Sequence, residues 1–159
     1  MLEKKADLWV VDADLRVIST NPVTRNDGAA VMGRGCAKEA KERFPGLEYH
    51  FGRLLDKHGN RVMRLAETAP DGTHALGLFS KDRTGTVLAS FPVKKHWREE
   101  AMPELIRRSA DQLLALADKF GYERIALPRP GCGNGRLLWA DVKVLLEPVL
   151  DDRFTVLSK

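Results

Sequence analysis

The sequence lacks the features that define several large classes of protein. No apolar run approaches the roughly 18 residues that a membrane-spanning helix needs. The N-terminal segment, Met1–Lys5, has neither the apolar stretch nor the small-residue cleavage site of a secretory signal. Repeats, low-complexity segments and long linkers are absent as well. We therefore expect one compact domain over residues 1–159, with no membrane partner.

Cysteine and histidine are scarce. Cys36 and Cys132 are the only cysteines, and two thiols without an export signal indicate a reduced, cytoplasmic protein. Neither cysteine has a second cysteine or a histidine at the sequence spacing that is typical of metal ligands, and the four histidines are scattered along the chain. We expect no metal and no cofactor. Both cysteines are interpreted as small residues that pack beneath the glycine-rich loops described below.

The excess of positive charge is small. Lysine and arginine number 26 against 22 acidic residues, which gives a net charge of +4. This balance favours an anionic partner, such as a phosphate ligand or a nucleic acid, without requiring one.

Short β-rich runs alternate with helical patterns. The sequence predicts helices over Met32–Phe44, Leu47–Lys57, Met102–Phe120 and Trp139–Leu150, and strands over Leu8–Val11, Arg16–Thr20, Arg61–Leu65, Ala75–Phe79, Val87–Phe91, Arg124–Leu127 and Phe154–Leu157. The clearest helix is the third, where Pro103 suits the first turn and Gly121 the C-terminal cap. This alternation indicates an α/β layered domain, and the apparent hairpins between the central strands indicate a mixed sheet.

Two glycine-rich loops stand out. Gly131-Cys132-Gly133-Asn134-Gly135 follows a predicted strand, and Met32-Gly33-Arg34-Gly35 opens a predicted helix. Such loops can cradle phosphate through converging backbone N–H groups, although the glycines would equally serve tight turns. A P-loop is excluded because no Gly-Lys-Ser/Thr follows either loop. A dinucleotide-binding fingerprint is excluded because its strand-helix-strand unit does not fit after Gly135.

Three segments, in this order, resemble those of macrodomains, which bind ADP-ribose. They are Thr20-Asn21 with Ala30–Ala37, then Phe91–Trp97, then Ile125–Pro128 with Gly131–Gly135 and Trp139. The middle segment resembles the branch that holds the terminal ADP-ribose glycohydrolases and the DNA ADP-ribosyl glycohydrolase antitoxins. The resemblance covers nearly the whole chain. It implies a three-layer α/β/α sandwich with a central mixed sheet.

The resemblance also implies a ligand site. Asn21 would hydrogen-bond the distal ribose of ADP-ribose, although an Asn-Pro turn is the simpler alternative. Asp7 would accept from the adenine amino group, unless it is a solvated acid. The remaining ligand residues would line the distal ribose and the diphosphate: Met32, Gly33, Arg34, Gly35, Gly131, Cys132, Gly133, Asn134, Gly135 and Arg136.

Lys94 is the residue expected to carry chemistry. In the resembling branch, the lysine at this place attacks the anomeric carbon of the distal ribose. A lysine does so only when unprotonated, which burial or a neighbouring cation promotes. Lys95, His96 and Arg98 are the candidate neighbours. A solvated Lys-Lys pair is the alternative, and the choice of Lys94 over Lys95 rests on the alignment alone.

One departure from the family pattern concerns the substrate. Protein-deconjugating members have an aspartate directly before an Arg-Leu pair in the second loop, where this chain has Gly135. DNA-directed antitoxin members have glycine there, so thymidine-linked ADP-ribosylated DNA is favoured over glutamate-linked protein. Asp141 lies nearby in sequence and is interpreted as a solvated helix residue.

Several functions remain open at this point. The leading expectation is an ADP-ribosyl glycohydrolase, with an ADP-ribosylating toxin as a possible functional partner. The alternatives are a non-catalytic ADP-ribose reader and an ADP-ribose 1″-phosphate phosphatase. Trp97 and Trp139 are expected in the core, although Trp97 could flank a base. The charges of Arg34, Lys38, Lys41 and Arg43 are interpreted as a solvated helix face, with a track for the DNA backbone as the alternative.

Overall fold

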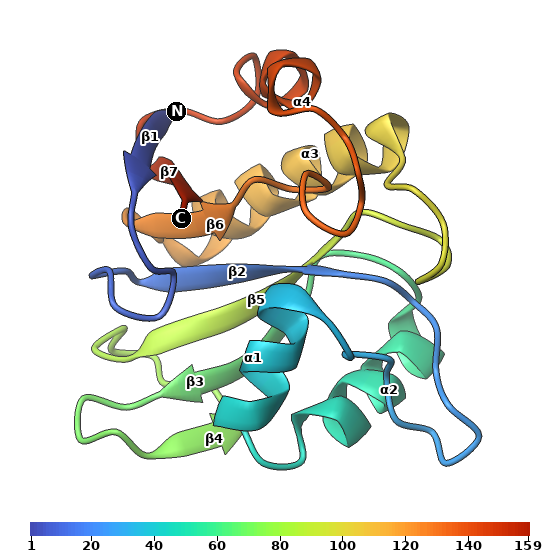
Figure 1. Ribbon diagram of the computed structural model, residues 1–159. Coiled ribbons are helices and arrows are strands. Elements are labelled where there is room, and N and C mark those ends of the chain that lie inside the picture. Colours follow the sequence, from blue (N-terminus) through green and yellow to red (C-terminus); the bar gives the residue numbers. More distant parts are fainter.

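The structure is a computed structural model of residues 1–159, and a seven-stranded sheet forms its middle layer (Figure 1). The strands lie in the order β1-β7-β6-β2-β5-β3-β4. Their bounds are β1 Leu2–Lys5, β2 Leu15–Thr20, β3 Arg64–Thr68, β4 His74–Leu76, β5 Thr86–Pro92, β6 Ile125–Pro128 and β7 Phe154–Ser158. Strands β1, β7, β6, β2 and β5 are parallel, whereas β3 and β4 are antiparallel to their neighbours. The predicted mixed sheet is confirmed.

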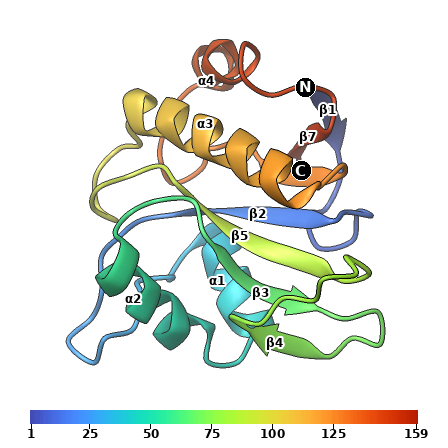
Figure 2. The same ribbon diagram turned by 180° about the vertical axis from the view of Figure 1, so that it is seen from behind.

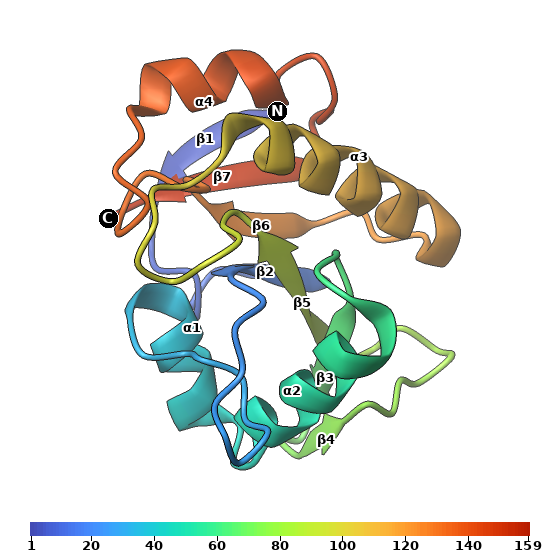
Figure 3. The ribbon, with the colours of Figure 1, turned by 90° about the vertical axis from the view of Figure 1, so that its right-hand side faces the viewer.

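Helices cover both faces of this sheet (Figures 2 and 3). Helices α1 (Gly35–Arg43) and α2 (Leu47–His58) pack on one face, and α3 (Pro103–Phe120) and α4 (Trp139–Leu146) on the other. Because apolar side chains alternate across the strands, each face has its own core. One cluster of 20 buried residues lies beneath α3 and α4, and one of 17 beneath α1 and α2. The expected three-layer α/β/α sandwich is confirmed. No helix has both the length and the apolar character for a membrane crossing.

The N-terminal prediction was wrong. Leu8–Val11 is a turn, because the Asp7 carboxylate accepts from the Trp9 N–H at 2.9 Å and the Asp7 carbonyl accepts from the Val11 N–H at 3.2 Å. The strand lies earlier, at Leu2–Lys5, where every residue is exposed. Its charged side chains suit an edge strand, and because they are not apolar the strand gives no hydrophobic pattern in the sequence.

Several other boundaries also moved. β3 begins at Arg64 instead of Arg61, because the Ser90 hydroxyl accepts from the Met63 N–H and donates to the Arg61 carbonyl, replacing the sheet ladder there. β4 ends at Leu76 instead of reaching Phe79, because Gly77 has a φ of +70°. Three further bounds differ by more than one residue: α1 begins at Gly35 and not at Met32, β3 ends at Thr68 and not at Leu65, and α4 ends at Leu146, two residues before Pro148, and not at Leu150. The other bounds, such as the start of β6 at Ile125 and not at Arg124, differ from the predicted ones by at most one residue.

One carboxylate joins the starts of the two central strands β2 and β6. Asp14 accepts from the backbone N–H groups of Glu123 and Arg124 at 3.0 and 2.9 Å, and from the Arg124 guanidinium at 2.7 Å. Burial raises the pKa of Asp14, but these hydrogen bonds outweigh burial and hold it below the usual value. Ionised Asp14 therefore stabilises the fold.

We expect Asp14→Asn to lower the free energy of unfolding by about 1–3 kcal/mol at neutral pH, because charge-assisted bonds are lost. The pKa of Asp14 is depressed in the folded state, so its stabilisation is present above the unfolded pKa of about 3.9 and is lost as pH falls below it. Urea denaturation between pH 7 and pH 3 measures this.

The matched control is Asp12→Asn, because Asp12 also pairs with Arg124 but its side chain is 83% exposed. It should change stability by less than about 1 kcal/mol. Equal destabilisation by both variants, or a loss from Asp14→Asn that is as large at pH 3 as at pH 7, would contradict the assignment.

Candidate functional site

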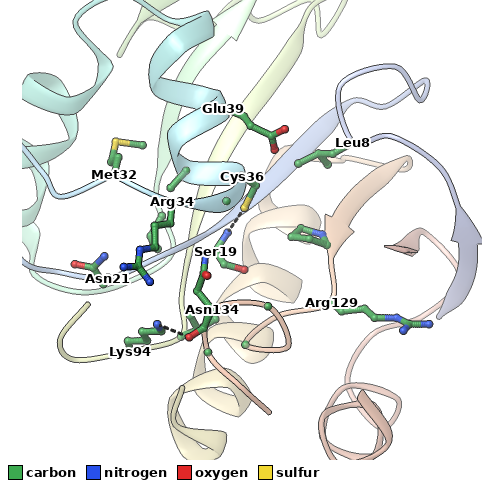
Figure 4. Close-up of a pocket in the computed structure, with 18 of the residues that line it drawn as sticks. Leu8, Ser19, Asn21, Met32, Arg34, Cys36, Glu39, Lys94, Arg129 and Asn134 are labelled. Atoms are coloured by element: carbon green, nitrogen blue, oxygen red, sulfur yellow. Dashed lines mark hydrogen bonds between the residues drawn. The ribbon is translucent and has the colours of Figure 1, made fainter. Parts of the chain in front are cut away.

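A cavity of about 820 Å³ opens at one edge of the sheet (Figure 4). Its walls come from the residues that end or directly follow β1, β2, β5, β6 and β7. These five strands are parallel, so their carboxyl ends meet at the same edge. Ligand crevices of open α/β sheets lie outside these ends. The topology therefore brings together segments from residue 5 to residue 159.

The first glycine loop leads into α1 on one side of the cavity. Gly33, Arg34 and Gly35 line it, followed by Cys36 and Ala37 in the first turn of α1. No side chain caps the N-terminus of this nine-residue helix. Its first backbone N–H groups and the positive end of its dipole therefore face the cavity, an arrangement suited to an anionic group.

The Asn21 side chain holds the shape of the same loop. Its Nδ2 donates to the Val31 carbonyl at 3.2 Å, and its Oδ1 accepts from the Val23 N–H at 3.0 Å. Asn21 also lines the cavity. The amide has one further N–H and one further lone pair, so the turn-forming role and the expected ribose contact are compatible.

The second glycine loop is closely packed against the segment that leads into α3. A Cβ on Gly135 would lie 2.5 Å from the Gly131 carbonyl oxygen and 2.7 Å from the Ala101 Cβ. The Ala101 N–H also donates to the Gly135 carbonyl at 3.0 Å. Gly131 has a φ of +75°, a conformation that favours glycine. Both glycines are thus required by the backbone of the loop itself.

Lys94 lies between the two loops, with its side chain in the cavity wall (Figure 4). The residue is only 8% exposed. Its Nζ donates to the Asn134 carbonyl at 3.1 Å and to the Trp97 carbonyl at 3.4 Å. The adjacent Lys95 is exposed and does not line the cavity. The geometry therefore distinguishes the two lysines, which the sequence could not.

The pKa of Lys94 is lowered. Burial is the largest cause, followed by the positive charges of Arg136 and then Arg34. The expected neighbours Lys95, His96 and Arg98 are not among the causes, and this expectation was wrong. Their side chains belong to an exposed loop, where Arg98 lies over the Trp97 ring at 4.7 Å. The second loop instead brings Arg136 close to Lys94 from a distant part of the sequence.

Most of the expected site residues line this cavity. They are Asp7, Asn21, Met32, Gly33, Arg34, Gly35, Lys94, Gly131, Gly133, Asn134 and Gly135. Cys132 and Arg136 do not line it. The Cys132 side chain packs against the core beneath α3 and α4, and Arg136 is exposed with a φ of +63°.

Other interpretations need correction. Trp97 is 37% exposed and lines the cavity, so its expected place in the core was wrong. Trp139 is partly buried, and its Nε1 donates to the Glu3 carboxylate at 2.8 Å.

Two other residues lie where the sequence placed them. Cys36 packs beneath the first loop as expected, and its Sγ accepts from the Ser19 N–H at 3.3 Å. Burial raises the pKa of its thiol. Asp141 is exposed in the first turn of α4.

Sequence reasoning missed part of the lining. Arg129 directly follows β6, and its guanidinium lies 5.1 Å from the centre of the Trp139 ring. Glu39 enters from α1, and Lys5 and Lys159 from the strand ends beside the Asp7 segment. The position of Arg129 after a buried strand was the one available signal. Lys5 and Lys159 became neighbours only through the pairing of β1 with β7.

We expect Arg136→Gln to raise the pKa of Lys94. A positive neighbour disfavours the ammonium form, so its removal shifts the pKa up toward the usual lysine value. Nuclear magnetic resonance titration of the lysine side chains measures this shift. Arg53→Gln, on the exposed side of α2, is the matched control and should leave the pKa unchanged. An unchanged or lower pKa in Arg136→Gln would contradict the electrostatic assignment.

Comparison with known proteins is consistent with this geometry. The Macro domain family model matches residues 29–146. A DNA ADP-ribosyl glycohydrolase of Thermus aquaticus is 27% identical over 121 residues, which are 76% of this chain and 31% of that protein. This chain thus spans about one third of the curated relative's length.

Two solved structures share the fold. The "Macrodomain of Mycobacterium tuberculosis DarG" has a TM-score of 0.75 at 22% identity, covering 99% of this chain and 97% of that one. "Thermosipho africanus DarTG in complex with ADP-ribose" has a TM-score of 0.76 at 23% identity, covering 95% and 39%. With the family model matching most of the length, the chain belongs to the Macro domain family.

Proposed function

We propose that the cavity binds ADP-ribose and that the protein is an ADP-ribosyl glycohydrolase. Lys94 carries the proposal: it is a buried amine with a lowered pKa in the wall of an anion-binding cavity. The relative from Thermus aquaticus is named for this activity, and the Thermosipho africanus structure contains ADP-ribose. The backbone N–H groups of α1 and of the second loop would hold the diphosphate.

In the proposed reaction each bond that forms replaces a bond that breaks, and the protein itself supplies the nucleophile and the proton. The amine lone pair of Lys94 attacks the anomeric carbon of the distal ribose, and the bond from this carbon to the modified group breaks with its electron pair on the leaving atom. That atom takes a proton from the new secondary ammonium. Water then displaces the lysine nitrogen and gives ADP-ribose, which restores the amine. A protonated lysine has no lone pair, so a lowered pKa is required.

We further propose that the bound group is a thymidine base of DNA and not a glutamate of protein. The proposal is supported by Gly135, where no side chain fits between the Gly131 carbonyl and Ala101. An aspartate that assisted release from glutamate would need that space. The closed packing accounts for the absence of an acid at this position.

Gly135→Asp should therefore disrupt the loop and give no new activity on glutamate conjugates. Overpacking of this kind costs about 1–3 kcal/mol of unfolding free energy, and the displaced loop should bind ADP-ribose weakly. Urea denaturation and calorimetric titration with ADP-ribose test this.

The double variant Gly135→Asp with Ala101→Gly should recover only part of the stability. It removes the Ala101 contact but leaves the Gly131 carbonyl in place. A single Gly135→Asp variant that is as stable as the wild type and cleaves glutamate conjugates would overturn the packing argument.

The activity is tested with thymidine-linked ADP-ribosylated DNA and, separately, glutamate-linked protein. We expect release of ADP-ribose from the DNA, with Lys94→Ala reducing the rate at least about 100-fold because the nucleophile is lost. Lys95→Ala is the matched control, because its side chain is exposed outside the cavity, and should keep the wild-type rate. For the wild type, the rate should rise with pH and level off below the pH at which a solvated lysine loses its proton, because the pKa of Lys94 is lowered.

Other outcomes identify the alternatives. ADP-ribose binding without release from either substrate would indicate a reader domain. Release of phosphate from ADP-ribose 1″-phosphate would indicate a phosphatase. Release from glutamate-linked protein alone would overturn the preference for DNA.

A further inference from the structure

The amine of Lys94 is held by two backbone carbonyls and by no carboxylate. Nζ donates to the Asn134 carbonyl at 3.1 Å and to the Trp97 carbonyl at 3.4 Å. No salt bridge involves Lys94, and no acidic side chain is among the causes of its pKa shift. The Trp97 carbonyl belongs to the segment that follows Lys94, and the Asn134 carbonyl belongs to the second glycine loop. This arrangement differs from a lysine paired with an acid, because both acceptors are neutral.

An unprotonated amine has two N–H bonds and one lone pair in a tetrahedral arrangement. Two acceptors therefore match its two hydrogens and leave the lone pair in the remaining direction. Lys94 lies in the cavity wall, and both carbonyls accept from its nitrogen; Figure 4 shows the bond to Asn134. We propose that the carbonyls of Asn134 and Trp97 orient the lone pair of Lys94 into the cavity, so that these residues are positioning residues for the nucleophile. This inference rests on the proposed glycohydrolase function.

Contacts of the neighbouring backbone fix both carbonyls. The peptide after Asn134 is held because Gly135 is pressed against Gly131 and Ala101, and because the Ala101 N–H donates to the Gly135 carbonyl. The segment that carries Trp97 is closed at its ends, where the Met102 N–H donates to the Val93 carbonyl at 2.8 Å.

Further bonds fix the same segment. The Asn60 side chain donates to the Lys94 carbonyl at 3.2 Å, and the Arg98 N–H donates to the His96 ring at 3.1 Å. The acceptors are therefore backbone groups in hydrogen-bonded segments and not parts of side chains. Such segments suit the orientation of a reacting atom, since small displacements have large effects on rate.

Gly135 gains a second role in this scheme. A side chain there would force the Asn134–Gly135 peptide away from Gly131 and Ala101, and so move the acceptor of Lys94. Gly135 thus leaves no room for an acidic side chain, and it keeps the neutral Asn134 carbonyl within hydrogen-bond distance of Lys94. Both roles depend on the position of the Asn134–Gly135 peptide.

The orientation is tested by weakening one acceptor without changing a side chain. The Gly131-Cys132 bond suits ligation of residues 1–131, prepared as a thioester, to a synthetic segment of residues 132–159. Glycolic acid in place of Gly135 turns the Asn134 carbonyl into an ester carbonyl, which is a weaker acceptor. The N–H that is lost makes no backbone hydrogen bond. It belongs to the loop that is proposed to hold the diphosphate, so rates are compared only at saturating substrate and the affinity of each ligated protein for ADP-ribose is measured by calorimetry.

Two ligated controls accompany this variant. One is the all-amide protein. The other has the hydroxy-acid analogue of leucine in place of Leu138, since neither the Leu137 carbonyl nor the Leu138 N–H takes part in a loop hydrogen bond, and Leu138 is 70% exposed outside the cavity.

Two readouts separate orientation from protonation. A weaker acceptor stabilises the ammonium less, so the pKa of Lys94, measured without substrate, should fall further in the 135-ester protein and not in the 138-ester protein. The single-turnover rate at saturating substrate, measured above the pKa, should nevertheless fall about tenfold in the 135-ester protein alone. A carbonyl that acted only through the pKa would instead raise the rate at neutral pH.

The outcomes are distinguishable. An active all-amide protein whose 135-ester form is equally fast or faster would overturn the orientation and leave the proposed function standing. An unchanged pKa in the 135-ester protein would overturn the contact itself. An all-amide protein that releases no ADP-ribose from DNA or protein would overturn the proposed function, and the orientation with it.

Discussion

The site depends on the close packing of Gly135 against Gly131 and Ala101. This contact joins the loop after β6 to the segment that carries Lys94, although the two are far apart in the sequence. It fixes the Asn134 carbonyl against Nζ of Lys94 at 3.1 Å and brings the charge of Arg136 close to the same amine. The hydrogen bond from Lys94 to the Asn134 carbonyl and the positive charge of Arg136 therefore both depend on the same loop. A side chain at position 135 would disturb both.

The two sides of the cavity contribute different properties. The first loop and the uncapped start of α1 present backbone N–H groups and a helix dipole, which favour an anion without distinguishing one phosphate compound from another. The segments around Lys94 contribute reactivity, because burial and two guanidinium groups disfavour its protonated form. The division is not complete, because the first loop also contributes Arg34 to the surroundings of Lys94. The backbone N–H groups of the second loop are likewise proposed to hold the diphosphate.

Much of the site was predictable because it follows the ends of strands. Lys94 comes after β5 and the Gly131–Gly135 loop after β6, and an apolar strand followed by glycines is visible in a sequence. Burial of Trp97 was predicted wrongly, because a tryptophan gives the same signal in a core and at a cavity mouth. The N-terminal strand was missed because its pairing with β7 uses backbone bonds and no apolar pattern.

The sequence by itself determined the layered α/β class, the family resemblance, the two glycine loops and the pair Lys94-Lys95. These are properties of local composition and order, which periodicity and spacing preserve. Only the tertiary structure decided which lysine enters the cavity, which arginines approach it and why position 135 must be glycine. Those answers depend on distances between segments that are far apart in the sequence, such as Lys94 and Asn134, which are 40 residues apart, or Ala101 and Gly135. The close packing that sets these distances has no signature in the sequence of either segment alone.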